Sequence, residues 1–314
     1  MSRSPTVDAL GRTAEVVQYY ELGYDPVAAN MLQRVKGKGS TGPVVYEGAV
    51  TWKATDTAVG PATLRIHPEP SGATVEAWGP GAQVASDRVP DLLGASDDPA
   101  GLQPGDPIVA DLMRRRRFDR MTRTNAIWEH IVPTVLGQKV PTAAARDSWQ
   151  AMLRRWGRKP PGPAPAKLRL VPSPEVLGSV GYHEFHPLNV ERKRAQTIIA
   201  AARRANRLEE ALEMPPAKAR ARLEAFPGIG PWTSSIVVQL GLGDPDSVVV
   251  GDYNLPGQVA WVLAGERDAD DARMLELLEP YQGQRARVQN LVKYAGSKRP
   301  RHGAKLDVID LTDR

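Results

Sequence analysis

The hydrophobic and polar positions change their period partway along the chain. In the first third, short apolar runs are bounded by Gly-Pro, Pro-Glu-Pro and Gly-Pro-Gly turn signals. These runs predict strands over Val44–Lys53, Ala62–His67 and Thr74–Trp78. From about residue 106 the apolar residues recur at helical spacing instead. The pattern therefore predicts an α+β protein in which a small antiparallel-sheet domain precedes a mostly helical part. Its predicted divisions are an N-terminal domain over 1–105, a helical core over 106–296 and a flexible tail over 297–314.

The helical series are clearest where apolar residues lie three and four positions apart. One series predicts a helix through Ile127, Ile131 and Leu136, and a second predicts a helix from Trp149 to Trp156. Between the second helix and the next apolar series, residues 159–174 are rich in proline and predict a loop or a stiff linker. No internal repeat is visible.

The segment 223–234 predicts a helix, a tight hairpin and a second helix. Gly228 and Gly230 tolerate unusual backbone angles and let another molecule approach the main chain closely. Ile229 between them is expected to anchor the turn in the core, and Pro231 suits the first position of a helix. Free N–H groups at such a helix start favour an anion, so we expect this hairpin to hold a phosphate.

The string Leu-Glu-Ala-Phe-Pro-Gly-Ile-Gly-Pro-Trp-Thr, which ends at Thr233, resembles the helix-hairpin-helix of the DNA base-excision glycosylases. Gly251-Asp252 resembles the Gly/Pro-Asp pair that gives that superfamily its name, and Asp252 lies 20 residues after Trp232, as in the superfamily. The resemblance is closest to the bacterial 3-methyladenine DNA glycosylase II family. Three weaker stretches agree with it: a Leu-Gly-Gln loop within Val135–Val140, a Pro-aromatic segment within Glu279–Arg285 and a Leu-Gly turn within Arg88–Gly94.

This resemblance implies a monofunctional DNA glycosylase of base excision repair that hydrolyses the N-glycosidic bond of a flipped, alkylated purine. Asp252 is the implied catalytic residue, because a carboxylate stabilises an oxocarbenium-like sugar and activates water. By itself, Asp252 also suits the simpler role of capping the helix that begins near Leu255. The implied base pocket contains Trp232, Tyr281 and Ile236, since aromatic rings attract a cationic base. The implied DNA contacts are Gly228, Gly230, Thr233, Gln138, Lys139 and Arg285.

Two positions depart from the family pattern. Lys139 stands where the family inserts an apolar wedge into the duplex, and Ile236 stands where a tyrosine is expected. These departures keep two alternatives open. One is a DNA-damage-binding repair accessory with little catalysis, and the other is a glycosylase for deaminated or cross-linked bases.

Two absences narrow the chemistry, that of cysteine from the whole chain and that of lysine from one position. The chain has no cysteine, which excludes the branches of the superfamily that hold an iron–sulfur cluster by four cysteines. The bifunctional branch carries a nucleophilic lysine where this chain has Trp232, so no lyase activity is expected. We expect no cofactor and no metal site, including at His183, Glu184 and His186. The resemblance does imply a monovalent cation at the hairpin carbonyls.

Charge and hydropathy suggest the partner and the compartment only weakly. The net charge is +5, and no apolar run approaches the ~18–20 residues that a membrane helix needs. The run Arg114–Arg117 suits either a solvated helix face or a contact to the DNA backbone. We expect a monomer that acts on damaged double-stranded DNA without a membrane, in the bacterial cytoplasm and near the nucleoid.

Overall fold

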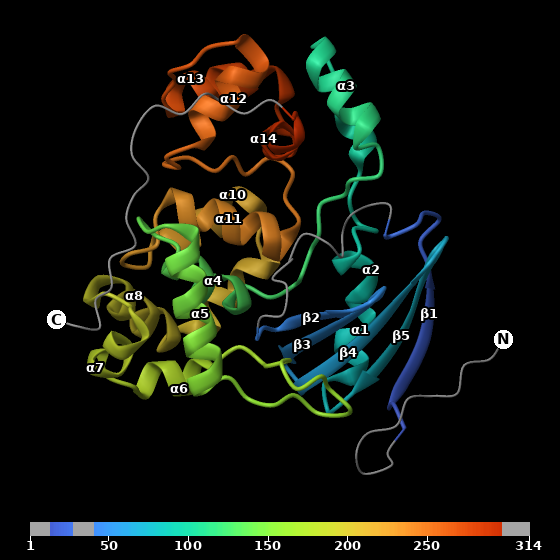
Figure 1. The fold of residues 1–314 in the computed structure, drawn as a ribbon, viewed down its shortest axis with the longest axis vertical. Coiled ribbons are helices and arrows are strands. Elements are labelled where there is room, and N and C mark those ends of the chain that lie inside the picture. Colours follow the sequence, from blue (N-terminus) through green and yellow to red (C-terminus); the bar gives the residue numbers. More distant parts are fainter. Residues whose placement is uncertain (1–12, 28–40, 297–314) are drawn as a thin grey trace.

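The computed structural model describes residues 13–27 and 41–296. A five-stranded antiparallel sheet lies at one end of the molecule and helices form the remainder (Figure 1). The predicted α+β class is therefore confirmed. The tail predicted over 297–314 lies outside the described residues.

The sheet contains two strands more than the turn signals indicated, one because the chain turns at Gly48 and one at the N-terminal edge. Its strands are β1 (Val16–Glu21), β2 (Val44–Glu47), β3 (Val50–Thr57), β4 (Gly60–Glu69) and β5 (Gly72–Trp78), in the order β1-β5-β4-β3-β2. The single strand predicted over Val44–Lys53 was wrong, because Gly48 adopts a φ of +61° and turns the chain between β2 and β3. Strand β1 was not predicted, since most of its side chains are exposed and show no apolar alternation.

Both faces of the sheet are covered. On one face, β4 and β5 pack against α1 (Ala82–Asp87) and α2 (Val89–Leu92). On the other face, Trp52 and Trp78 pack against Leu168 and Leu170 of the proline-rich loop. Gly162 of that loop lies so close that a Cβ there would meet the Trp78 ring at 2.5 Å. The loop thus serves as one layer of the N-terminal part.

The helices form two hydrophobic clusters. The larger cluster joins α4 through α11 and buries Ile131, Leu136 and Phe185 completely. Its helices are α4 (Trp128–Leu136), α5 (Thr142–Trp156), α6 (Pro174–Ser179), α7 (Tyr182–Phe185), α8 (Arg192–Ala202), α9 (Ala205–Glu209), α10 (Pro216–Glu224) and α11 (Pro231–Leu242). The smaller cluster joins α3 (Pro107–Arg115) to α12 (Leu255–Ala264), α13 (Asp271–Leu278) and α14 (Arg285–Leu291).

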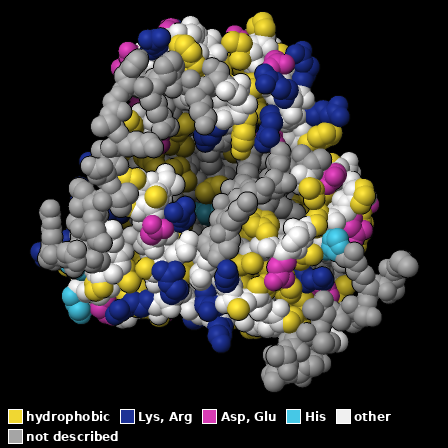
Figure 2. Space-filling view, viewed as in Figure 1, with side chains coloured by type: hydrophobic (Ala, Val, Ile, Leu, Met, Phe, Trp, Pro, Cys, Tyr) yellow, Lys and Arg dark blue, Asp and Glu magenta, His cyan; other side chains and the backbone are white. Residues whose placement is uncertain are grey.

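The arginine run lies at the end of α3, which packs beside α14 (Figure 1). In the space-filling view, Lys and Arg side chains gather over this helix (Figure 2). Arg114 and Arg115 pair with Asp111, while Arg116 pairs with Asp119 and stacks on the Tyr294 ring. Most of the run is therefore engaged in contacts within the protein.

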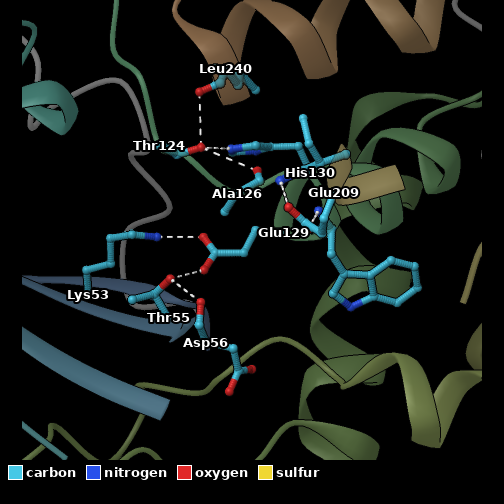
Figure 3. A network of polar contacts seen from close by, with 11 residues as sticks. Lys53, Thr55, Asp56, Thr124, Ala126, Glu129, His130, Glu209 and Leu240 are labelled. Atoms are coloured by element: carbon cyan, nitrogen blue, oxygen red, sulfur yellow. Dashed lines mark hydrogen bonds and ion pairs between the residues drawn. The ribbon is translucent and has the colours of Figure 1, made fainter. Parts of the chain in front are cut away.

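A buried ion pair fastens the sheet to the helices (Figure 3). The ammonium of Lys53 on β3 lies 2.6 Å from the carboxylate of Glu129 on α4, and Thr55 donates a hydrogen bond to the other oxygen. Both charged side chains are at most 10% exposed. Lys53 and Thr55 hold the pKa of Glu129 below its ordinary value against the opposing effect of burial. Such a pair is costly to break from one side, because the remaining charge is left buried.

Two further titratable groups, His130 and Glu209, lie near this ion pair and interact with the charge of Glu129. His130 shares a 2.7 Å hydrogen bond with the Thr124 hydroxyl, and burial lowers its pKa from 6.5 to about 4. Glu209 accepts hydrogen bonds from the N–H groups of Ile127 and Trp128, and burial raises its pKa. Glu209 thereby caps the start of α4 from a distant part of the chain.

We expect His130→Asn to reduce the acid sensitivity of the fold. The unfolded chain binds the histidine proton near pH 6.5 and the folded chain only near pH 4, so this contribution is complete above about pH 6.5 and declines as the pH falls. The variant should lose about 1–3 kcal/mol less than wild type between pH 7 and 4.5. Urea unfolding at both pH values measures this difference. Glu129 and Glu209 titrate in both proteins, so a difference that is independent of pH would contradict the prediction.

Candidate active site

The hairpin between α10 and α11 is held by a close backbone contact. Gly228 has a φ of +86°, and a Cβ there would lie 2.1 Å from the Thr197 hydroxyl of α8. Ile229 is 3% exposed and packs in the larger helical cluster, which confirms that it anchors the turn. The close approach to α8 and the positive φ together require glycine at position 228.

The outer side of the hairpin is open. A Cβ at Gly230 would meet no atom within 4 Å. In the described part of the chain, the N–H groups of Gly228, Gly230 and Trp232 donate no hydrogen bond to the protein. Pro231 begins α11, so these groups lie at the positive end of a 12-residue helix. The arrangement suits an anion such as a phosphate.

The loop after α4 is fastened to this hairpin. The Gln138 side-chain amide donates to the carbonyl of Gly228 and to the hydroxyl of Thr233, both at 2.9 Å. Thr233 is only 1% exposed, so its hydroxyl faces the protein, which differs from the phosphate-facing hydroxyl expected from sequence. The buried Arg194 donates to the carbonyl of Leu136 at 2.8 Å and fixes the end of α4. Gln138 therefore sets the distance between the loop and the hairpin.

Lys139 follows Gln138 at the exposed end of this loop. Its φ of +55° is unusual for a residue other than glycine, which shows that its surroundings impose the conformation. The preceding Gly137 lies against Trp232, since a Cβ there would approach the far edge of the indole ring to 3.3 Å. Lys139 thus lies two residues along the chain from Gly137, which is in contact with the Trp232 ring.

Asp252 approaches the same indole from the other side. Its Oδ1 accepts hydrogen bonds from the N–H groups of Asn254 at 2.8 Å and Leu255 at 3.0 Å. Its Oδ2 accepts a weaker one from Trp232 Nε1 at 3.3 Å. Asp252 therefore binds the first N–H groups at the start of α12 from a position two residues before its N-cap, Asn254, while its second oxygen points toward the hairpin helix. One carboxylate makes both sets of contacts because its two oxygens face different partners.

The backbone before Asp252 is also fixed. Gly251 has a φ of +76° and donates its N–H to the Asp271 carboxylate at 2.8 Å. A Cβ at Gly251 would lie 3.9 Å from Trp232. The carboxylate of Asp252 is therefore placed by hydrogen bonds on both sides of it and by the indole.

The remaining predicted site residues take different positions. Ile236 is half-buried on α11, four residues after Trp232 and hence on the same helix face. Tyr281 is 7% exposed and packs among the residues of α3, α12 and α14, where burial raises its pKa. Arg285 pairs with Asp246 through two nitrogens, at 2.9 and 2.6 Å. No contact in the described chain joins Tyr281 or Arg285 to Asp252, and their roles remain predictions.

Among the described residues, no group of three or more His, Asp or Glu side chains could hold a metal ion. Glu184 of the histidine-rich stretch instead pairs with Arg155 at 3.0 Å. The described part of the chain also contains no helix that is long and apolar enough to cross a bilayer.

Sequence comparison gives one kind of relative. A segment of 178 residues, 54% of this chain, is 30% identical to a Mycobacterium tuberculosis protein described as a probable bifunctional transcriptional activator/DNA repair enzyme AlkA. The matched segment spans 35% of that relative's length, so the chain corresponds to about a third of it. No family model matches the chain.

Similar solved structures share the whole architecture. The 3-methyladenine DNA-glycosylase of Archaeoglobus fulgidus superposes with a TM-score of 0.74 at 20% identity, over 88% of this chain and 98% of that one. An 8-oxoguanine glycosylase/lyase of Clostridium acetobutylicum superposes with a TM-score of 0.67 at 10% identity, over 90% of this chain and 99% of that one. The fold is therefore that of the helix-hairpin-helix DNA glycosylases. The sequence relative and the shared fold confirm the resemblance to this superfamily and to the 3-methyladenine glycosylase II family that was found in the motifs.

The two hairpin glycines should respond differently to alanine. We expect Gly228→Ala to lower the free energy of unfolding by about 1–3 kcal/mol, because it combines a strained φ with a clash against Thr197. Gly230→Ala, which has open space and extended backbone, should cost about 1 kcal/mol or less. Urea unfolding of both variants measures the contrast. Equal losses would show that Thr197 yields easily and that this contact does not hold the hairpin.

Proposed function

We propose that this protein is a monofunctional DNA glycosylase that removes alkylated purines from double-stranded DNA. The observation that carries the proposal is the contact between the Asp252 carboxylate and Trp232. Trp232 lies at the start of α11, next to the hairpin whose N–H groups are open. The relatives support it because those whose names state an activity are DNA glycosylases or DNA repair enzymes. Substrate, activity and partner are each part of the proposal.

The hairpin supplies the grip on DNA. The open N–H groups of Gly228, Gly230 and Trp232 suit one backbone phosphate near the lesion. Contacts of this kind fix the register of the protein on the duplex without reading its sequence. Gln138 supports them indirectly, because its bond to the Gly228 carbonyl holds the turn in place. The target nucleotide must then leave the stack, at a cost of a few kcal/mol.

The chemistry uses a single carboxylate. The bond between C1′ and the purine nitrogen breaks, its electron pair leaves with the base, and positive charge develops on the sugar. Asp252 stabilises that charge and takes a proton from the water that attacks C1′. A purine alkylated at N3 or N7 carries a positive charge, so it departs as a neutral base without needing a general acid. The indole of Trp232 suits such a base, because electron-rich rings attract cations.

The lack of an amine at the position of the bifunctional branch's lysine supports monofunctional chemistry. The position that carries a nucleophilic lysine in the bifunctional branch is occupied by Trp232, whose indole cannot form a Schiff base. We therefore propose that the product is an intact abasic site.

A damage-binding accessory is the second candidate. The exposed Lys139 favours it, since a lysine is a poorer wedge than an apolar residue at the tip of this loop. Tight binding of an abasic-site analogue without release of any base from methylated, deaminated or cross-linked duplexes would identify this function.

The decisive test is release of free bases from methylated duplex DNA. Asp252→Asn should lower single-turnover release of 3-methyladenine and 7-methylguanine by about 10²–10⁴-fold. Asparagine is also a good helix cap, so α12 and the fold should remain intact. The matched control is Asp147→Asn, an exposed carboxylate on α5 that pairs with its neighbour Arg146. Full activity in Asp252→Asn would reject the assignment of the catalytic carboxylate, and strand cleavage by the wild type would reject the monofunctional assignment.

A further inference from the structure

Tyr253, the residue after the candidate catalytic carboxylate, is 87% exposed. No other large hydrophobic side chain in the described chain is as exposed, and the next, Val59, reaches 62%. In the same part of the chain, no hydrogen bond or ring contact engages the Tyr253 side chain. Single exposed apolar residues are common on protein surfaces, so the exposure alone decides nothing. Tyr253 is of interest because it directly follows Asp252, the candidate catalytic residue.

The main chain that carries Tyr253 is rigidly placed. The Asp252 carboxylate accepts hydrogen bonds from the two residues that follow Tyr253, and Gly251 is tied to Asp271. Tyr253 therefore sits within a closed turn whose backbone cannot move without disturbing the carboxylate. A tyrosine has only two side-chain torsions to fix, so little conformational entropy is lost when such a ring binds a partner.

The turn that carries Tyr253 and the loop that carries Lys139 both approach the same tryptophan, Trp232. Gly137, two residues before Lys139, lies against one edge of Trp232, while Asp252 bonds to its Nε1 and Gly251 approaches its Cβ. The two exposed side chains therefore emerge from two loops that meet at Trp232. A duplex bound with its lesion at Asp252 would lie against both loops.

A flipped nucleotide leaves a gap in the base stack that some side chain must fill. Lysine has a flexible apolar stem but no face on which a base can stack, and its ammonium favours the phosphates. An aromatic ring stacks on neighbouring bases, whatever the sequence. Of the two side chains, the tyrosine suits the gap and the lysine suits the backbone.

We propose that Tyr253 fills the space that the flipped nucleotide vacates, while Lys139 contacts the adjacent backbone. This inference rests on the proposed binding of damaged DNA. It makes Tyr253 a positioning residue, which stabilises the flipped state and takes no part in breaking the bond. Lys139 stands at the position of the family's apolar wedge, and Tyr253 on the neighbouring loop then takes over the role of that wedge.

The test uses the full-length protein and a duplex that holds a tetrahydrofuran abasic analogue opposite 2-aminopurine. Wild type should bind this duplex and change the 2-aminopurine fluorescence as the ring stacks beside it. Tyr253→Ala should weaken binding by about 5- to 150-fold and remove most of the fluorescence change. Its affinity for undamaged duplex and its urea midpoint should stay at wild-type values, because the side chain is exposed.

Three further variants separate stacking from other roles. Tyr253→Phe should retain both signals, because it keeps the ring. Adding Lys139→Leu to Tyr253→Ala should restore part of the binding by supplying an apolar wedge on the other loop. Tyr19→Ala, an exposed tyrosine on β1, is the control and should behave as wild type.

The inference is overturned if Tyr253→Ala keeps the wild-type affinity and fluorescence change, if Tyr253→Phe loses them, or if wild type does not bind the abasic duplex. Base release separates this inference from the proposed function. Release that depends on Asp252, together with an unaffected Tyr253→Ala, leaves the glycosylase and removes the role of Tyr253. Loss of the fluorescence change in Tyr253→Ala, without base release by wild type, leaves the gap-filling role and removes the glycosylase.

Discussion

The contact between the Trp232 indole and its neighbours is the constraint on which the candidate site depends. Its ring edge limits how closely the loop at Gly137 can approach, and its Nε1 meets the carboxylate of Asp252. Three segments that are far apart in sequence are thereby brought to one place: the loop after α4, the hairpin helix α11 and the turn before α12. A smaller side chain at this position would leave the loop and the carboxylate without a common support.

The sheet contributes to this arrangement indirectly. Its strand β3 is tied to the first turn of α4 by Lys53 and Glu129, and α4 ends at the loop that carries Gln138 and Lys139. A displacement of the sheet would therefore be transmitted along a single helix to the site. The buried charges make this joint specific in orientation, since an unpaired carboxylate there would be strongly unfavourable.

Local motifs were the most predictable part of the molecule. The glycines of the hairpin, the anchoring Ile229 and the Gly-Asp turn follow from backbone rules that act within a few residues, and the periodicity of α4 is strong. Strand β1 escaped detection because an edge strand with exposed side chains lacks an apolar face. The inward-facing hydroxyl of Thr233 could not be foreseen, since its partner Gln138 lies 95 positions away. Tyr253 carried a sequence signal, an aromatic residue next to the Gly-Asp pair, but only its exposure distinguishes it from a core tyrosine.

The covering of the sheet by residues 162–170 has a consequence for the order of folding. Trp52 and Trp78 stay exposed until this segment, about 90 residues after Trp78 and about 116 after Trp52, has been synthesised and has packed onto them. Helix α3 likewise waits for α12–α14, which come near the end of the described chain. Contacts between such distant segments slow folding and prolong the exposure of apolar surface in the nascent chain. The sheet part is therefore a late-maturing unit, although it precedes the helical part along the chain.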